Sequence, residues 1–195
     1  MGRKLGLTLE RVVEAAAEIV DRDGLDALSL ASLASTLGVR SPSLYNHVDG
    51  LNGLRRQLAL HTSNLLAADL ADSVHGLEGT EALRAIAGQL RSFAHRHPGL
   101  YDSLLPAPTP DEDPELAAAL RESVSVVGSV LAGMDVDPAT VIPLIRALRA
   151  SVHGFVDLEL RGGFGLPDDI DDSFTTTVNL VIEAIAAHSR TGANS

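Results

Sequence analysis

The sequence contains no cysteine and no tryptophan, and only 3% of its 195 residues are aromatic. Without cysteine the chain can form neither disulfides nor thiolate metal sites, and it offers no cysteine nucleophile. The core must be built from Leu, Val, Ile and Ala, and a hydrophobic content of 45% is enough for a sizeable one. A charged, apolar leader and an unbroken run of about 18 apolar residues are also missing. We therefore expect a soluble cytoplasmic protein with no membrane partner.

An overall basic charge is lacking as well, because the formal net charge is -11 at pH 7. Residues 1–56 contain seven Lys or Arg and seven Asp or Glu, whereas residues 57–195 contain eight and nineteen. The excess of acid thus lies entirely in the second part of the chain. Nucleic-acid binding is compatible with the N-terminal part alone, and we expect it to be strongly salt-dependent and to rest on few charged contacts.

The segment 28–48 has the features of two short helices joined by a tight turn. Ser29 can cap the first helix, and Gly38 can adopt the left-handed conformation that ends it. Ser41 as N-cap and Pro42 as first helical residue predict that a second helix begins at once. Two helices so closely joined must cross steeply, as in a helix-turn-helix. The apolar positions that share one face of the first helix are Leu30, Leu33, Ala34 and Leu37.

The second helix would bury Leu44 and Val48 and turn polar side chains outward. Hydroxyl, amide and phenol groups on such a face can reach base edges and phosphates in a major groove. The alternative is a helical hairpin whose polar side only faces water, and the tight turn at Gly38 argues against it. The candidate DNA-binding residues of this unit are Ser29, Arg40, Ser41, Pro42, Ser43, Tyr45, Asn46 and His47.

A short basic arm precedes the first predicted helix. Arg3 and Lys4 stand among glycines, where the chain is too short and flexible to pack. Such an arm can follow a phosphate backbone or enter a minor groove, and both residues are further DNA-binding candidates. A solubilising tail without contacts is the alternative.

Helical periodicity continues along the rest of the chain, including one helix of roughly two dozen residues that begins at Leu51. We predict an all-α fold of about nine helices, with a three-helix DNA-binding headpiece over 1–50 and a second helical domain over 51–195. The helices near 138–160 and 170–188 are apolar on two faces. In a homodimer with two-fold symmetry they would form a four-helix seam.

Residues 8–56 resemble the DNA-binding domain of the TetR family of transcriptional regulators. The motifs that carry the resemblance are Leu37-Gly38-Val39, Ser41-Pro42-Ser43 and Leu44-Tyr45-Asn46-His47-Val48. Many members have a Lys three residues after this last motif, where it touches phosphate; Leu51 stands there in this chain. The resemblance implies a homodimer that binds a palindromic double-stranded DNA operator, most often as a repressor that a small molecule releases. It also implies that the helical domain over 51–195 is a ligand-binding and dimerisation domain.

The C-terminal part resembles the TetR subgroup named for a Trp-His-Gly signature. His153-Gly154 is present, but Val152 replaces the tryptophan. If an effector binds, the aliphatic composition favours a largely apolar small molecule. The candidate effector contacts are Phe93, Tyr101, Arg149 and His153.

Two other functions are alternatives to this one. A DNA-binding regulator without a small-molecule effector is compatible with the sequence. An all-helical enzyme is disfavoured, because no nucleophile with a base, no carboxylate pair and no phosphate-binding loop in its required context is present. His95 and His97 lack the i, i+4 spacing of metal ligands on one helix face. We therefore expect no catalytic residue, no metal and no cofactor.

Overall fold

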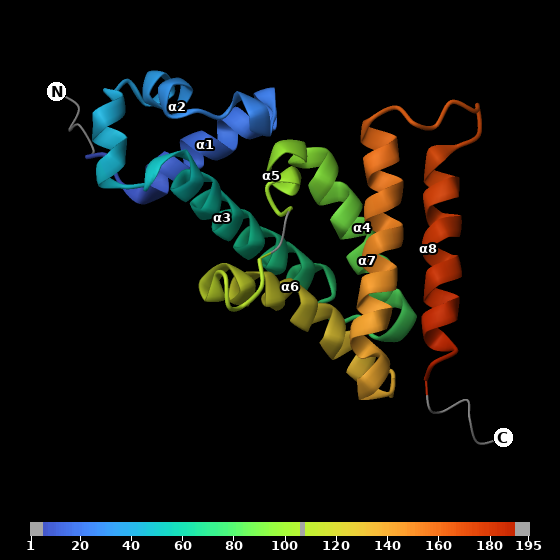
Figure 1. Cartoon of the computed structure of the whole chain (residues 1–195). Coiled ribbons are helices and arrows are strands. Elements are labelled where there is room, and N and C mark those ends of the chain that lie inside the picture. The colour runs from blue at the N-terminus through green and yellow to red at the C-terminus, as the bar shows by residue number, and fades with distance from the viewer. Residues whose placement is uncertain (1–5, 106–107, 190–195) are drawn as a thin grey trace. The chain divides into compact units, whose positions relative to one another are not determined.

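The computed structural model describes residues 6–105 and 108–189 (Figure 1). These residues form α-helices and two short 3-10 helices, and their one β-type pairing is a single bridge between Val136 and Ser189. The predicted all-α fold is confirmed. The elements are α1 (Leu9–Asp23), η1 (Leu25–Ala27), α2 (Leu30–Leu37), η2 (Ser41–Asn46), α3 (Gly50–Ser73), α4 (Gly79–Arg96), α5 (Pro98–Asp102), α6 (Pro114–Gly133), α7 (Pro138–Leu160) and α8 (Ile170–Ala186).

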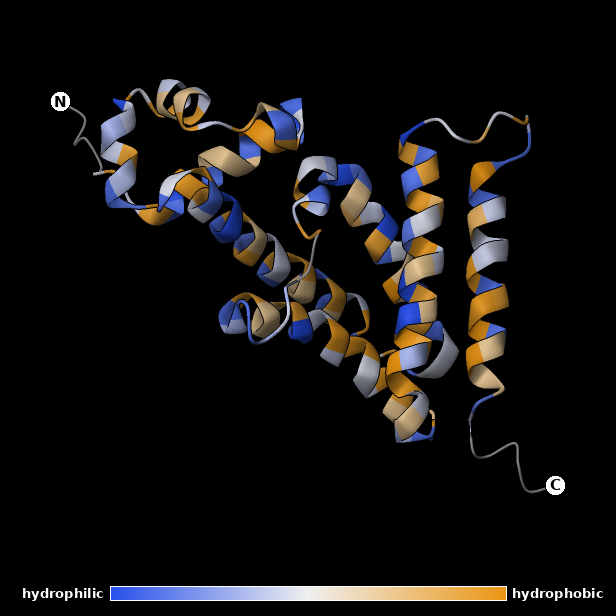
Figure 2. Ribbon diagram, viewed as in Figure 1, coloured by the Kyte–Doolittle hydropathy of each residue, from blue (hydrophilic) through white to orange (hydrophobic). Residues whose placement is uncertain are grey.

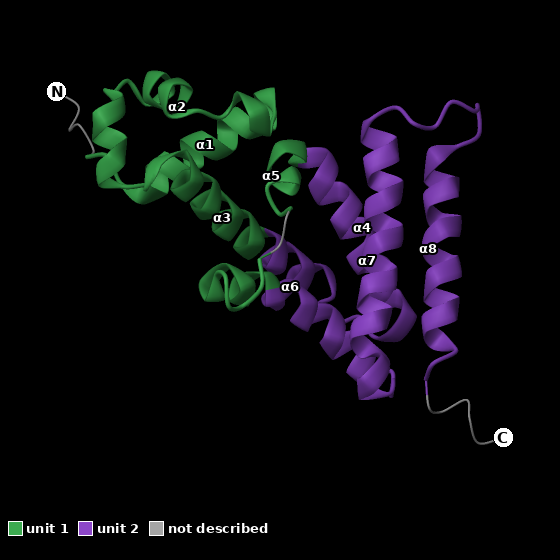
Figure 3. Cartoon of the chain, viewed as in Figure 1, with its two compact units in different colours: residues 1–65, 97–120 green, residues 66–96, 121–195 purple. Residues whose placement is uncertain are grey.

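The chain divides into two compact units (Figure 3). Unit 1 comprises residues 1–65 and 97–120, and unit 2 comprises residues 66–96 and 121–195. The helices α3 and α6 each contribute residues to both units. Unit 1 therefore extends beyond the headpiece that the sequence suggests, because α5 and the start of α6 pack with it. A functional division at residue 50 stays a prediction.

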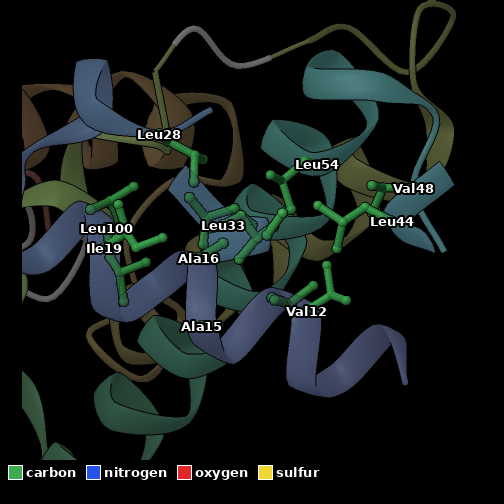
Figure 4. Packing of buried hydrophobic residues seen from close by; sticks show 14 residues of the cluster. Val12, Ala15, Ala16, Ile19, Leu28, Leu33, Leu44, Val48, Leu54 and Leu100 are labelled. Atoms are coloured by element: carbon green, nitrogen blue, oxygen red, sulfur yellow. The ribbon is translucent and has the colours of Figure 1, made fainter. Parts of the chain in front are cut away.

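Unit 1 is organised around α1. The Thr8 hydroxyl accepts a hydrogen bond from the Arg11 amide at 3.3 Å and caps the helix, and Gly24 ends it with φ +84°. The apolar stripe of α1 packs against α2, η2, α3 and α5, as predicted for the first three helices (Figure 4). Each fully buried Leu or Ile contributes about 1.5–3 kcal/mol. The largest fully buried side chains here are Ile19, Leu28, Leu33, Leu44, Leu54, Leu58 and Leu100.

Unit 2 is built on α4, α7 and α8, which pack pairwise against one another. Figure 1 shows α7 and α8 side by side and antiparallel. Arg91 on α4 binds Glu159 of α7 and Asp171 of α8, and His95 also contacts Glu159, at 2.9 Å. Hydrogen bonds from the Arg91 guanidinium hold the pKa of Glu159 at about 2, well below its ordinary value of 4.5. An ionic cluster thus ties the three helices together.

Two helices of the described residues, α6 and α7, are long and apolar enough to cross a membrane by length and composition alone. This finding qualifies the expectation, drawn from the absence of an unbroken apolar run, that the protein has no membrane partner. Core helices of soluble proteins pass the same test. In the most apolar 18-residue stretch of α6, only 22% of the residues are buried within the chain. The corresponding share for α7 is 33%. Figure 2 shows apolar residues along the length of both α7 and α8. Most residues in these stretches of α6 and α7 are therefore left uncovered by the single chain.

Candidate nucleic-acid interface

The helix α2 is fixed by a capping box. The Ser29 hydroxyl accepts a hydrogen bond from the Ser32 amide at 3.0 Å, and the Ser32 hydroxyl accepts one from the Ser29 amide at 3.0 Å. Both bonds satisfy amides that a helix start leaves without partners. The predicted cap is confirmed. Because its hydroxyl is occupied and the residue is half-buried, Ser29 has a structural task besides the predicted contact with DNA.

The turn after α2 has the geometry that the sequence predicts. Gly38 lies in the left-handed region, with φ +65° and ψ +31°. Its amide donates to the Ser35 carbonyl at 3.2 Å, and the Val39 amide reaches back to the Ala34 carbonyl at 3.0 Å. An L side chain is strained at this φ, so a glycine suits this position, from which the chain turns toward η2.

The second helix of the motif differs from the prediction, because residues 41–46 form a 3-10 helix and not an α-helix. Arg40 occupies the N-cap position, and no side chain caps the helix, so the assignment of Ser41 as N-cap is wrong. Pro42 lies in the first turn, but it is the second residue of the helix and not, as predicted, the first. It has no amide to donate, and it disfavours the helical conformation for the residue before it. The first turn therefore closes through the tighter bond from the Ser43 amide to the Arg40 carbonyl, at 2.9 Å.

The 3-10 geometry assigns the faces of this segment. With three residues per turn, residues 41, 44 and 47 share one side. Leu44 is fully buried there, and Ser41 and His47 are half-buried. Val48 is buried as well, so the prediction that Leu44 and Val48 anchor the segment is confirmed. The polar side chains of the other two sides are thus held outward by apolar residues.

The outward side chains are those expected to read DNA. Pro42, Tyr45 and Asn46 are exposed, with 62% of Tyr45 accessible, and Ser43 is half-buried. The structure brings these residues together on one short segment. Arg3 and Lys4 lie outside the described residues.

The cations near this segment are fewer than the sequence suggests. Arg40 and Arg55 are exposed. Arg56 instead donates to Asp113, at 2.8 Å from Nη2 to Oδ1, and to Glu115 at 2.7 Å. The Arg56 guanidinium lowers the pKa of Asp113 to about 2, so this arginine is neutralised by carboxylates far along the chain. Sequence reasoning missed the pairing because its partners are more than 50 residues away.

A second feature that sequence reasoning missed is the docking of α5 on α1. Asp21 of α1 accepts a hydrogen bond from the Leu100 amide at 3.1 Å, and its other oxygen lies 2.7 Å from Nδ1 of His97. Gly99 packs so closely that a Cβ there would lie 1.9 Å from the Val20 carbonyl oxygen. Only glycine therefore fits at position 99, because any Cβ would collide with the backbone of α1. Nothing in the local sequence indicates this close contact.

The four candidate effector contacts lie in different surroundings. Phe93 is fully buried in α4, Tyr101 is half-buried in α5, and on α7 His153 is half-buried while Arg149 is exposed. Tyr101 belongs to unit 1 and the other three to unit 2. Their role in binding an effector stays a prediction.

Comparisons with known proteins agree with this geometry. Residues 83–181 match the family described as tetracyclin repressor-like, C-terminal domain. An uncharacterised HTH-type transcriptional regulator of Mycobacterium tuberculosis is 35% identical over 190 residues, which cover 97% of this chain and 85% of that protein. A second uncharacterised HTH-type transcriptional regulator, from Bacillus subtilis, is 32% identical, and the matched residues cover 97% of this chain and 98% of that protein.

Among solved structures, a TetR variant of Acinetobacter baumannii in complex with minocycline shares the fold. Its TM-score is 0.72 at 22% identity, over 94% of this chain and 99% of that protein. The Trp-His-Gly subgroup stays a prediction. The family match over half of the chain and the two near-full-length relatives lead to one conclusion: the chain belongs to the TetR family of helix-turn-helix, DNA-binding transcriptional regulators.

Proposed function

We propose that the protein is a homodimeric repressor that binds a palindromic operator and is released from it by a small, largely apolar effector. The observation that carries the DNA-binding part is the segment 41–46, which exposes polar side chains while Leu44 and Val48 anchor it. In a two-fold symmetric dimer, two such segments about 34–36 Å apart would enter successive major grooves.

Each exposed residue of the segment has a role in this proposal. Tyr45 and Asn46 present a phenol and an amide that can hydrogen-bond base edges or phosphates. Arg40 supplies a charge that phosphate attracts. Further contacts are proposed for Ser29, Ser41, Pro42, Ser43, His47, Arg3 and Lys4.

The proposed dimer seam uses α7 and α8. Leu180 is 63% exposed and lies on the side of α8 opposite its buried residues, and Leu158 on α7 is 50% exposed. Along α7, a separate stripe consists of small, exposed residues. Small residues allow helices to approach closely, and covering the leucines removes apolar surface from water. The exposed small residues of this stripe are Ala147, Ala150 and Gly154.

Release by an effector requires only that the ligand binds two conformers of the dimer with different affinity. If the conformer it favours holds the two segments at a different spacing, both can no longer enter successive grooves of one operator. Phe93, Tyr101, Arg149 and His153 are the proposed contacts. The minocycline complex of the A. baumannii protein supports the view that this fold can hold a small molecule.

The test of the DNA-binding proposal is a selection of fragments from genomic DNA by the purified full-length protein. We expect a two-fold symmetric sequence to be enriched. Tyr45→Ala and Arg40→Ala should each weaken binding to it by at least about tenfold, because loss of one contact costs about 1–3 kcal/mol and the dimer carries two copies. Circular dichroism should show both variants folded, since both side chains are exposed.

Arg121→Ala is the matched control, because this arginine is also exposed but lies on α6. It changes the net charge as Arg40→Ala does, and it should leave operator affinity nearly unchanged. Wild-type affinity in both Tyr45→Ala and Arg40→Ala would remove the assignment of residues 41–46 to the major groove.

A further inference from the structure

An open apolar groove lies within unit 2, between the end of α3, the segment that follows it and the second half of α6. Its volume is about 520 Å³, which falls within the range of about 300–1,000 Å³ typical of small-molecule sites. The aliphatic side chains that line it are Ala71, Val74, Leu77, Val126 and Val130. None of these five is fully buried, so the groove is accessible from solvent.

One charged side chain, that of Glu78, lines this groove. Within the described residues its carboxylate has no ion-pair or hydrogen-bond partner. The hydroxyl of Ser129, also in the lining, donates to the carbonyl of Ser125 in its own helix at 3.0 Å. The groove therefore offers a ligand aliphatic walls and one uncompensated negative charge.

The surroundings reinforce the sign of this charge. Asp72 and Asp135 stand close in sequence to lining residues, and both are exposed and unpaired within the described part of the chain. Arg84, the nearest arginine along α4, keeps its charge but lies outside the lining, and it donates to Asn179 and Thr80. Charges of one sign around a partly apolar cleft concentrate ions of the opposite sign.

We infer that this groove binds an apolar organic cation, whose hydrocarbon surface packs on the aliphatic walls while its charge faces Glu78. None of the four residues proposed above as effector contacts lines this groove, so the inference goes beyond the proposed function and adds a separate small-molecule site. Binding there does not depend on the role of the proposed effector. An apolar anion is disfavoured because it would face an unpaired carboxylate.

Titration calorimetry of the full-length protein with tetraphenylphosphonium tests the inference, and tetraphenylborate serves as the anion of nearly equal size and shape. We expect the cation to bind and the anion not to bind. Glu78→Gln should weaken binding of the cation by about fivefold, the upper end for an exposed ion pair. This loss should shrink as salt is added.

Two further variants locate the site. Glu81→Gln removes the same charge from an exposed residue outside the lining, and it should leave the affinity within about twofold of wild type because of screening. Val130→Trp fills the groove from a half-buried position and should abolish binding with the fold intact by circular dichroism. Equal binding of both ions, or unchanged affinity for the cation in Glu78→Gln and Val130→Trp, would overturn the inference.

Operator binding is measured on the same samples to separate this inference from the proposed function. If the protein binds the selected operator but not tetraphenylphosphonium, the inference fails while the DNA-binding proposal stands. If the cation binds as expected but the protein selects no symmetric DNA site, the groove stands as a binding site and the operator proposal fails.

Discussion

Replacement of Gly99 by alanine tests how tightly α5 is docked on α1. The new Cβ would lie 1.9 Å from the Val20 carbonyl oxygen and 2.4 Å from the carbonyl carbon. The two helices would have to separate by about 1.1 Å before the oxygen contact reaches 3.0 Å. The Val20 carbonyl also accepts the Gly24 amide that ends α1, at 2.9 Å. Neither side of the contact can yield without breaking a hydrogen bond.

The cost follows from these contacts. Overpacking a well-filled site costs about 1–3 kcal/mol, and a rigid backbone neighbour places this substitution at the upper end. Separation would also stretch the bonds from Asp21 to Leu100 and His97, and a hydrogen bond to a charged group contributes about 1.5–3 kcal/mol. We expect a loss of about 3–5 kcal/mol in the free energy of unfolding, and the melting temperature should fall by about 6–20 °C.

Urea and thermal unfolding, followed by circular dichroism, measure this change. Gly88→Ala is the matched control, because a Cβ at this exposed helical glycine meets no atom within 4 Å. It should stabilise the protein by about 0.5–1 kcal/mol. The double variant Asp21→Ala/Gly99→Ala should be little less stable than Gly99→Ala alone, since one separation breaks both contacts. A Gly99→Ala protein as stable as wild type would refute the close contact between α5 and α1.

Three further predictions follow from single contacts. Gly154→Arg should convert the dimer to monomer in analytical ultracentrifugation, whereas Gly88→Arg should not; a dimeric Gly154→Arg would contradict the proposed seam. Glu159→Gln should destabilise the protein most above pH 5, where the stabilisation by ionised Glu159 is complete. The difference should shrink as pH falls from the ordinary pKa of about 4.5 toward the lowered pKa of about 2, because protonation of Glu159 removes its ion pairs. A pH-independent difference in urea unfolding would argue against this. Ser29→Ala should cost about 1 kcal/mol, whereas Ser35→Ala in the same helix should cost nothing in the same assay.

The sequence alone determined the parts of this protein that depend on neighbouring residues. The cap at Ser29 and the left-handed turn at Gly38 follow from local chemistry, and the structure has both. The burial of Leu44 and Val48 follows from helical spacing. The resemblance to the TetR family rested on the same short segment, because its motif combines that turn with those anchors.

Only the tertiary structure decided features whose partners lie far apart in the chain. The pairing of Arg56 with Asp113, the ionic cluster around Glu159 and the contact of Gly99 with Val20 each join residues separated by more than 50 positions. The 3-10 form of residues 41–46 also escaped prediction, because helical spacing over six residues fits either geometry. Local sequence sets which residues cap, turn and face inward, whereas long-range packing sets which charges are neutralised and which surfaces remain open.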